Sequence, residues 1–180
     1  MMVTEFEVAW LAGLLDGEGS VGASLTPAGK GKSAITVSVQ MSITCRPTLE
    51  ETLRVIRGLG VIACGYTYQE RDPTKHLDAY YLRVTRLLDI ATLAERVRPY
   101  SVTKRAHWDA MHEFVASRLL VSTTLPSGRA RRGGNYRKRA FSTREIELAK
   151  TLKVLNARGP GAKVRADEWF ARLGSVERAA

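Results

Sequence analysis

Two acidic residues, Asp16 and Glu18, stand where an apolar segment runs into the turn-like sequence Asp-Gly-Glu-Gly. The apolar segment predicts a helix, so both carboxylates fall at a helix C-terminus, where the negative end of the helix dipole disfavours them. A divalent cation relieves such repulsion, and Mg²⁺ binds through one or two carboxylates together with phosphate oxygens and water. On these residues alone, the turn-like composition favours Glu18 as an exposed acid in a turn, and a metal ligand is the alternative. Asp16 is better explained as a residue that organises the helix end.

A lysine and two glycines are candidates for the same site. Lys104 falls at the start of a predicted helix, where the dipole disfavours a cation, so its position needs a reason. A nearby phosphate or polarised water would supply one; the alternative is an ordinary surface lysine. Gly13 and Gly17 lie four residues apart, hence on one helical face, and small residues on such a face let a second helix approach closely.

Capping signals and periodicity predict the helices that must position these residues. The sequence contains three capping boxes, in which a Ser or Thr is followed three residues later by Glu, and each opens a predicted helix: Thr4–Glu7, Thr48–Glu51 and Ser142–Glu145. Glycines or prolines end most of the apolar patterns that follow. The predicted helices cover residues 4–17, 48–58, 87–97, 103–120, 142–155 and 167–173.

Strict alternation of apolar and polar side chains over residues 33–44 predicts a strand with one face of each kind. Further strands are predicted at 20–25, 61–69 and 77–85, the last two joined by a turn. The order over about residues 4–98 is αββαββα, which predicts an α+β fold with a four-stranded antiparallel sheet and helices on its apolar face. The polar face of such a sheet needs water or a partner.

The positive charge of this chain is concentrated in its last third. The 180 residues carry a net charge of +10, and the last sixty hold 14 basic against 5 acidic side chains. Many of these basic residues fall in a glycine-rich loop at 127–140. A basic pole attracts a polyanion, and nucleic acid is the commonest one in cells. A solvated basic surface without a partner is the alternative.

Composition excludes several other classes of protein. The length fits one domain, Cys45 and Cys64 cannot form a disulfide framework, and the three histidines are too scattered for a zinc site. No apolar run approaches the roughly 20 residues of a membrane span, and the N-terminus lacks the pattern of a signal peptide. We therefore expect an intracellular protein, in a bacterial or phage cytoplasm or an organelle matrix, with no membrane partner.

The ten residues around the acidic pair read Trp10-Leu11-Ala12-Gly13-Leu14-Leu15-Asp16-Gly17-Glu18-Gly19, and they closely resemble the signature of the LAGLIDADG homing endonucleases. Two later segments fit the same family. The segment at 98–105, Arg-Pro-Tyr-Ser-Val-Thr-Lys-Arg, resembles the one that supplies its active-site lysine, and Leu-Asn-Ala-Arg-Gly at 155–159 resembles the end of a late helix in single-motif members. The resemblance covers roughly residues 5 to 165. It implies the family's saddle-shaped αββαββα fold with C-terminal helices, as a single domain over residues 1–165 followed by a short helix and tail at 166–180.

The resemblance also implies a function. Single-motif members are site-specific DNA endonucleases of intron homing, which make a Mg²⁺-dependent double-strand break without an organic cofactor. One motif per chain implies a homodimer on a long, near-palindromic target. By the resemblance, Glu18 and the backbone oxygen of Gly17 hold the metal and Lys104 belongs to the active site. The dimer interface would contain Leu11, Ala12, Gly13, Asp16 and Gly17.

A further polar position of the family, just after the second strand, orients solvent near the metal. Counting back from Gly60 without gaps places Thr44 there. The same count puts Met41 where a polar, base-reading residue is expected, whereas a shift of one residue puts Gln40 there. A β-bulge would satisfy both positions, so Thr44 and Gln40 are both retained as candidates.

DNA contacts are expected from two sets of side chains. The polar strand faces would read bases, because a two-stranded ribbon fits the major groove; the alternative is a solvated sheet face. The candidates are Ser24, Thr26, Thr36, Ser38, Gln40, Thr67, Gln69, Tyr81 and Arg83. Phosphate contacts set most of the salt-dependent affinity, and their candidates are Lys30, Lys32, Arg137, Lys138, Arg139, Arg158 and Lys163.

Three other functions remain compatible with the sequence. A non-catalytic DNA-binding protein would use the same scaffold without cleavage, and an RNA maturase would bind structured RNA in preference to duplex DNA. A structural or interaction module unrelated to nucleic acid would show no salt-dependent DNA binding.

Overall fold

The computed structural model describes residues 2–29, 32–70, 78–120, 140–157 and 162–173. These residues form a mixed α+β fold in the predicted order αββαββα, followed by further helices. The elements are α1 (Glu5–Glu18), β1 (Gly19–Gly29), β2 (Lys32–Ile43), α2 (Arg46–Gly58), β3 (Cys64–Gln69), β4 (Ala79–Val84), α3 (Leu87–Val97), the 3₁₀ turn η1 (Arg98–Tyr100), α4 (Arg105–Leu120), α5 (Thr143–Leu155) and α6 (Ala162–Arg172).

The four strands form one antiparallel sheet in the order β1-β2-β4-β3. The pairing register separates two faces. One row across the sheet holds Val21, Val39, Val84 and Cys64, and the next holds Ser20, Gln40, Arg83 and Gly65. Because neighbouring residues of a strand point to opposite faces, the register confirms the predicted apolar and polar faces.

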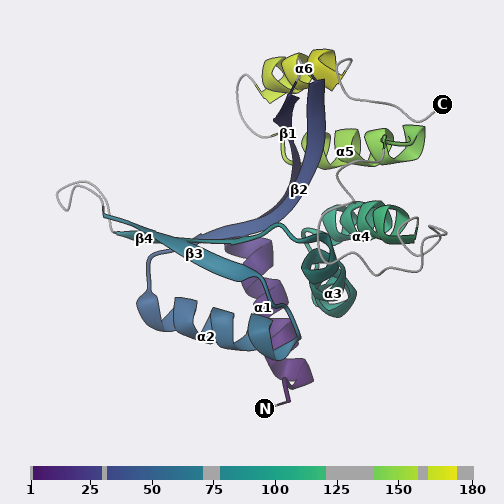
Figure 1. Ribbon diagram of the computed structural model, residues 1–180. Coiled ribbons are helices and arrows are strands. Elements are labelled where there is room, and N and C mark those ends of the chain that lie inside the picture. Colours follow the sequence, from purple (N-terminus) through teal and green to yellow (C-terminus); the bar gives the residue numbers. More distant parts are fainter. Residues whose placement is uncertain (1, 30–31, 71–77, 121–139, 158–161, 174–180) are drawn as a thin grey trace.

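The sheet is strongly curved (Figure 1). Helices α1 and α2 lie beneath its apolar side, and α3, α4 and α5 continue the helical layer along the same convex side. The concave polar side carries none of these five helices, while α6 lies near the outer end of the β1–β2 hairpin. The described residues therefore have the shape of a saddle, with one face that helices α1 to α5 leave uncovered.

The core lies between the apolar face of the sheet and the helices. Leu11 and Leu15 of α1 are fully buried, as are Trp108, Phe114 of α4 and Leu152 of α5. Burying one such large apolar side chain stabilises the fold by about 1.5–3 kcal/mol. None of the described helices has the length and apolar character that a membrane crossing requires.

Two of the three predicted capping boxes are confirmed. Thr4 and Ser142 each accept the backbone N–H of the Glu three residues later, and that Glu accepts the cap N–H in return. The third prediction, at Thr48, is wrong. Helix α2 begins two residues earlier with Cys45 as its N-cap, because Pro47 suits the first turn of a helix, where its missing N–H costs nothing.

The strand that was predicted to start at residue 61 starts at Cys64 instead. The amides of Ile62 and Ala63 donate to the buried carboxylate of Asp89, at 3.2 and 2.9 Å, and not to a strand. The last helix starts five residues earlier than predicted. The turn at 71–75 lies outside the described residues, as does almost all of the basic loop at 127–140.

Candidate functional site

The C-terminal tip of α1 carries an exposed carboxylate. Glu18 is the last residue of α1 and is exposed, and β1 starts at the next residue with no loop between them. The Gly19 N–H donates to the Leu15 carbonyl. A Cβ on Gly19 would lie 2.6 Å from that oxygen, so the direct turn from helix to strand requires glycine here. Glu18 is therefore held where the sheet begins.

The end of strand β2 lies beside this tip. Gly19 pairs with Met41 and Ser20 with Gln40, so the α1–β1 junction is next to the last residues of β2. Gln40 is exposed on the polar face, whereas Met41 is buried on the apolar face. Pairing between β2 and β4 runs from Val39 to Ile43 without a bulge, and Thr44 is exposed one residue beyond the strand.

The Asp16 carboxylate caps the start of α4. One oxygen accepts the Ser101 hydroxyl at 2.6 Å and the Lys104 amide at 3.3 Å. The other accepts the amides of Val102 and Thr103 at 2.6 and 2.9 Å. Partial burial raises the pKa of Asp16, but these hydrogen bonds outweigh it, so the pKa lies below its usual value and the carboxyl stays ionised.

The Lys104 ammonium group is directed back at α1. Its Nζ donates to the Leu15 carbonyl at 2.9 Å and also to the Asp16 carbonyl, and the residue is only 3% exposed. The sequence offered a phosphate or polarised water as the reason for a cation at this helix start. The structure shows another reason: the negative C-terminal end of α1 attracts it.

A Mg²⁺ ion would fit the donors at this tip. Among the described parts of the chain, no group of three or more His, Cys, Asp or Glu side chains converges on one point. Each chain instead offers the Glu18 carboxylate and the nearby Gly17 carbonyl. Mg²⁺ typically uses one or two carboxylates and completes its shell with phosphate oxygens and water, so a shared site with a bound phosphate suits this donor set.

One face of α1 is not covered by the core of the chain. Leu11 and Ala12, two of the residues expected at the dimer interface, have no exposed surface in the single chain and pack in its core. Gly13 and Gly17 are exposed, and a Cβ on either would meet no atom within 4 Å. Phe6, at the other end of the same helix, is 82% exposed.

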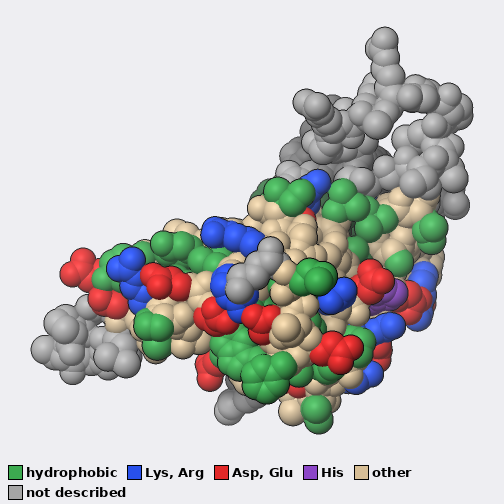
Figure 2. All heavy atoms as spheres, turned by 90° about the horizontal axis from the view of Figure 1, so that it is seen from below, with side chains coloured by type: hydrophobic (Ala, Val, Ile, Leu, Met, Phe, Trp, Pro, Cys, Tyr) green, Lys and Arg blue, Asp and Glu red, His purple; other side chains and the backbone are tan. Residues whose placement is uncertain are grey.

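This outer face continues into a hollow between α1 and α2. The cavity has a volume of about 380 Å³ and is lined by Phe6, Glu7, Trp10, Pro47, Thr48 and Glu51. Figure 2, seen from the side on which α1 begins, shows apolar side chains gathered into a patch with charged side chains around it. No pattern in the sequence indicates this hollow.

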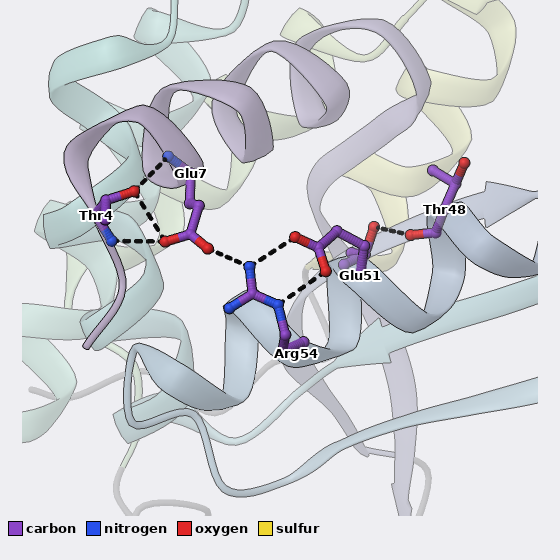
Figure 3. A network of polar contacts seen from close by, with 6 residues as sticks. Thr4, Glu7, Thr48, Glu51 and Arg54 are labelled. Carbon is purple, nitrogen blue, oxygen red and sulfur yellow. Dashed lines mark hydrogen bonds and ion pairs between the residues drawn. The ribbon is translucent and has the colours of Figure 1, made fainter. Parts of the chain in front are cut away.

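A charged network holds the two helices that form the hollow (Figure 3). Glu7 accepts the Thr4 amide at 2.7 Å, and its other oxygen pairs with Arg54 of α2. Arg54 also binds Glu51 at 2.6 and 2.8 Å. The hydrogen bond to Thr4, followed by that to Arg54, lowers the pKa of Glu7 to about 2. The capping box identified Glu7, but nothing in the sequence indicated that Arg54 would reach it.

The polar face of the sheet holds the predicted base-reading residues in register. Thr26 and Thr36 are joined through their hydroxyls at 2.9 Å, and the Ser24 hydroxyl donates to the Thr36 carbonyl at 3.4 Å. Ser38 is buried and has little surface to offer a ligand. The remaining candidates on this face are Gln40, Thr67, Gln69 and Arg83, which are exposed, and Tyr81, which is half-buried.

The predicted phosphate-binding residues fall mostly outside the described part of the chain. Lys30, Arg137, Lys138, Arg139 and Arg158 lie outside the described residues. Lys32 lies in β2 and Lys163 in α6, but the description does not extend to their side chains. In the segment around Arg158, the structure adds a contact that the sequence did not indicate. Asn156 donates to the Val21 carbonyl of β1 at 2.8 Å, and Gly22 beside it leaves the necessary space.

No protein-family model and no curated protein sequence matches this chain. Solved structures do match it. The archaeal intron-encoded homing endonuclease I-Vdi141I, solved with DNA, superposes with a TM-score of 0.59 at 15% identity, over 93% of this chain and 98% of that one. The homing endonuclease I-CvuI, solved with its target in the presence of Ca, superposes with a TM-score of 0.56 at 17% identity, over 96% and 97% of the two chains.

A third match differs in length. The LAGLIDADG homing endonuclease I-GzeII, solved with a DNA target, has a TM-score of 0.53 at 12% identity; the match covers 96% of this chain but 50% of that one. At these identities the matches establish the fold alone. The fold of this chain is that of the homing endonucleases, as the sequence predicted.

Proposed function

We propose that this chain is a site-specific DNA endonuclease that makes a Mg²⁺-dependent double-strand break in a long, near-palindromic target as a homodimer. The observation that carries the proposal is the position of Glu18. Its exposed carboxylate stands at the end of α1, at the point where the polar face of the sheet begins, on the side that helices α1 to α5 leave uncovered. I-Vdi141I and I-CvuI, which share this fold, were solved as DNA complexes.

The sheet supplies the surface for the DNA. A curved antiparallel ribbon fits the major groove, where hydrogen-bonding side chains distinguish all four base pairs. Gln40 and Arg83 are direct neighbours across β2 and β4, and both are exposed on the polar face. A duplex seated on this face passes the tip of α1, which brings its phosphates to Glu18.

The tip of α1 supplies the metal site. Glu18 and the Gly17 carbonyl would hold Mg²⁺, which when bound activates water and stabilises the leaving oxygen of an in-line displacement. The Glu18 carboxylate contributes the negative charge that fixes the position of the cation. Lys104 lies at the same tip, and the exposed Gln40 and Thr44 are the candidates for orienting solvent there.

The proposed homodimer follows from the number of active sites. A double-strand break requires two of them, and each chain provides one, at the C-terminal tip of its α1 helix. The open space over Gly13 and Gly17 allows the α1 helix of a second copy to approach closely. The exposed Phe6 side chain gives the same face an apolar contact that a second copy would bury.

Glu18→Gln tests the catalytic assignment. Duplexes selected by binding from a randomised DNA library serve as substrates for cleavage with Mg²⁺. The amide removes the negative charge and keeps the size of the side chain, so we expect cleavage to fall at least about a hundredfold while DNA affinity changes little. Glu95→Gln, at an exposed position of α3, is the matched control and should cleave normally. Unchanged cleavage by Glu18→Gln would remove this residue from the mechanism.

The same assays separate the alternatives. Duplex binding by the unaltered protein without cleavage in Mg²⁺ identifies a non-catalytic DNA-binding protein. Stronger binding to structured RNA than to duplex DNA identifies a maturase. Absence of salt-dependent binding to either nucleic acid leaves an interaction module.

A further inference from the structure

The ends of α1 and α4 cap each other through two side chains. Asp16, at the end of α1, accepts hydrogen bonds from the residues that lead into α4. Lys104, at the start of α4, donates to two carbonyls in the last turn of α1. Asp16 and Lys104 thus form a pair of crossed contacts, here called the reciprocal clasp, in which each helix supplies the charge that the end of the other attracts.

The electrostatics of both halves of the clasp are favourable. Amides at the start of a helix carry a partial positive charge and favour a carboxylate, whereas carbonyls at its end favour a cation. Lys104 is almost completely buried, and so is Ser101, which donates to Asp16. A buried charge is costly unless hydrogen bonds satisfy it, so both contacts are strongly preferred over solvent in the folded chain.

The clasp acts directly on the backbone that carries Glu18. The Leu15 carbonyl accepts both the Lys104 ammonium and the Gly19 N–H. One oxygen therefore joins the clasp to the residue that follows Glu18, and Gly19 has no space for any side chain. Gly17 and Glu18 lie between the two fixed points, Asp16 and Gly19.

We propose that Lys104 and Asp16 are positioning residues, which hold the Gly17–Glu18 segment in place through the reciprocal clasp. Lys104 acts through the carbonyls of Leu15 and Asp16 and not by contact with substrate or by proton transfer. The consequence for cleavage rests on the proposed endonuclease function, but the effect on the backbone does not.

A double-mutant cycle tests the clasp, with Lys104→Met and Asp16→Asn as single variants. Methionine keeps an unbranched, apolar stem and removes the donor; asparagine removes the charge of the cap. Two exposed positions serve as matched controls, Lys150→Met on α5 and Asp167→Asn on α6. The readouts are amide exchange of residues 15–20, the Mg²⁺ concentration for half-maximal cleavage, and the pH profile of the cleavage rate.

Each single variant should accelerate exchange over residues 15–20 and raise the Mg²⁺ midpoint, both on the order of tenfold. The pH profile should keep its shape. Because both residues act through one clasp, the double variant should show no more than the larger single effect. The control variants should match the unaltered protein.

Three outcomes would overturn the proposal. Normal amide exchange in Lys104→Met together with lost cleavage would mean that Lys104 acts on the substrate directly. A shifted pH profile of the cleavage rate in Lys104→Met would indicate that Lys104 takes part in proton transfer. If the effects of the two single variants multiply in the double variant, Lys104 and Asp16 have independent roles. If Asp16→Asn does not fold, Ser101→Ala replaces it, since it removes only the 2.6 Å hydroxyl contact and should give a smaller effect of the same kind.

The exchange measurement separates the clasp from the proposed function. If the unaltered protein cleaves no DNA, the endonuclease function fails, and exchange alone decides the clasp. Faster exchange in Lys104→Met and Asp16→Asn would then support it, and unchanged exchange would overturn it.

Discussion

Arg54 of α2 forms an ion pair with Glu7 of α1, 47 residues earlier in the chain. The same guanidinium binds Glu51 of its own helix, so one arginine holds two carboxylates beside the hollow between the two helices (Figure 3). The pair fixes the start of α1 against α2. The ion pair therefore supports the helix whose outer face is the proposed dimer contact.

Replacing Glu7 by Gln should lower stability in a pH-dependent way. The pKa of Glu7 in the fold is about 2, against a usual 4.5, so its ionised form is favoured by folding. The ionised Glu7 carboxylate therefore adds to the free energy of unfolding. This contribution is complete above pH 4.5 and is lost as the pH falls toward 2. Urea unfolding at a series of pH values should therefore show a lower free energy of unfolding for Glu7→Gln than for the unaltered protein at pH 7. This difference should shrink below pH 4.5.

Glu95→Gln, at an exposed position of α3, is the control for this series and should change stability little at pH 7. If the loss of unfolding free energy in Glu7→Gln stays constant from pH 7 down to pH 2, the ionised carboxylate does not have the role assigned to it.

Gly13→Leu should give a folded monomer. The structure leaves open space around this position within one chain, and leucine favours a helix over glycine by somewhat less than about 1 kcal/mol. A second α1 helix could no longer approach closely, so the dimer should dissociate. Sedimentation of the Gly13→Leu variant should show a monomer. Its circular dichroism should show an unchanged helix content. Ala171→Leu, exposed on α6, should leave the dimer intact; a dimer that survives Gly13→Leu would exclude this face as the contact.

Arg83→Ala should weaken DNA binding. Arg83 is exposed on the polar face and lies between Gln40 and Gly65 in the sheet register. Loss of a base contact costs about 1–3 kcal/mol, or roughly tenfold to a hundredfold in affinity, and a lost phosphate contact reduces the salt slope by about one. Affinities measured at several salt concentrations distinguish the two. Arg96→Ala, on the helical side in α3, should bind like the unaltered protein.

The two thiols should react at different rates. Hydrogen bonds from the Thr48 side chain and backbone lower the pKa of the exposed Cys45, whereas burial raises the pKa of Cys64 to about 11. The thiolate is the reactive form, so a disulfide reagent at pH 8 should modify Cys45 first. Cys45→Ser should abolish the fast phase, and a fast phase that persists would contradict this assignment.

Local signals in the sequence predicted most of the fold. The helix Leu87–Val97 has its predicted bounds, and the Ser142–Glu145 box marks the start of α5. The strand faces also follow the predicted alternation, because burial against a helical layer selects one face of every strand. These signals depend on neighbours in the chain and can be read without the tertiary structure.

Other features depend on residues far apart in the sequence. Helix α1 is apolar around most of its circumference, so periodicity could not show that Leu11 and Ala12 face the core while Gly13 faces outward. Lys104 was identified as a cation that needed a partner. Its partner is the end of α1, a contact across 89 residues that no local pattern encodes.

The cap of α4 also bears on the order in which the chain folds. Its first turn contains no acidic residue, and the carboxylate that satisfies its leading amides comes from Asp16, 88 residues earlier in the sequence. Closing so long a loop is slow and carries an entropic cost. During synthesis, therefore, the last turn of α1 lacks its partner until the segment through residue 104 has left the ribosome. The end of α1 and the start of α4 are then expected to become ordered in a single late step.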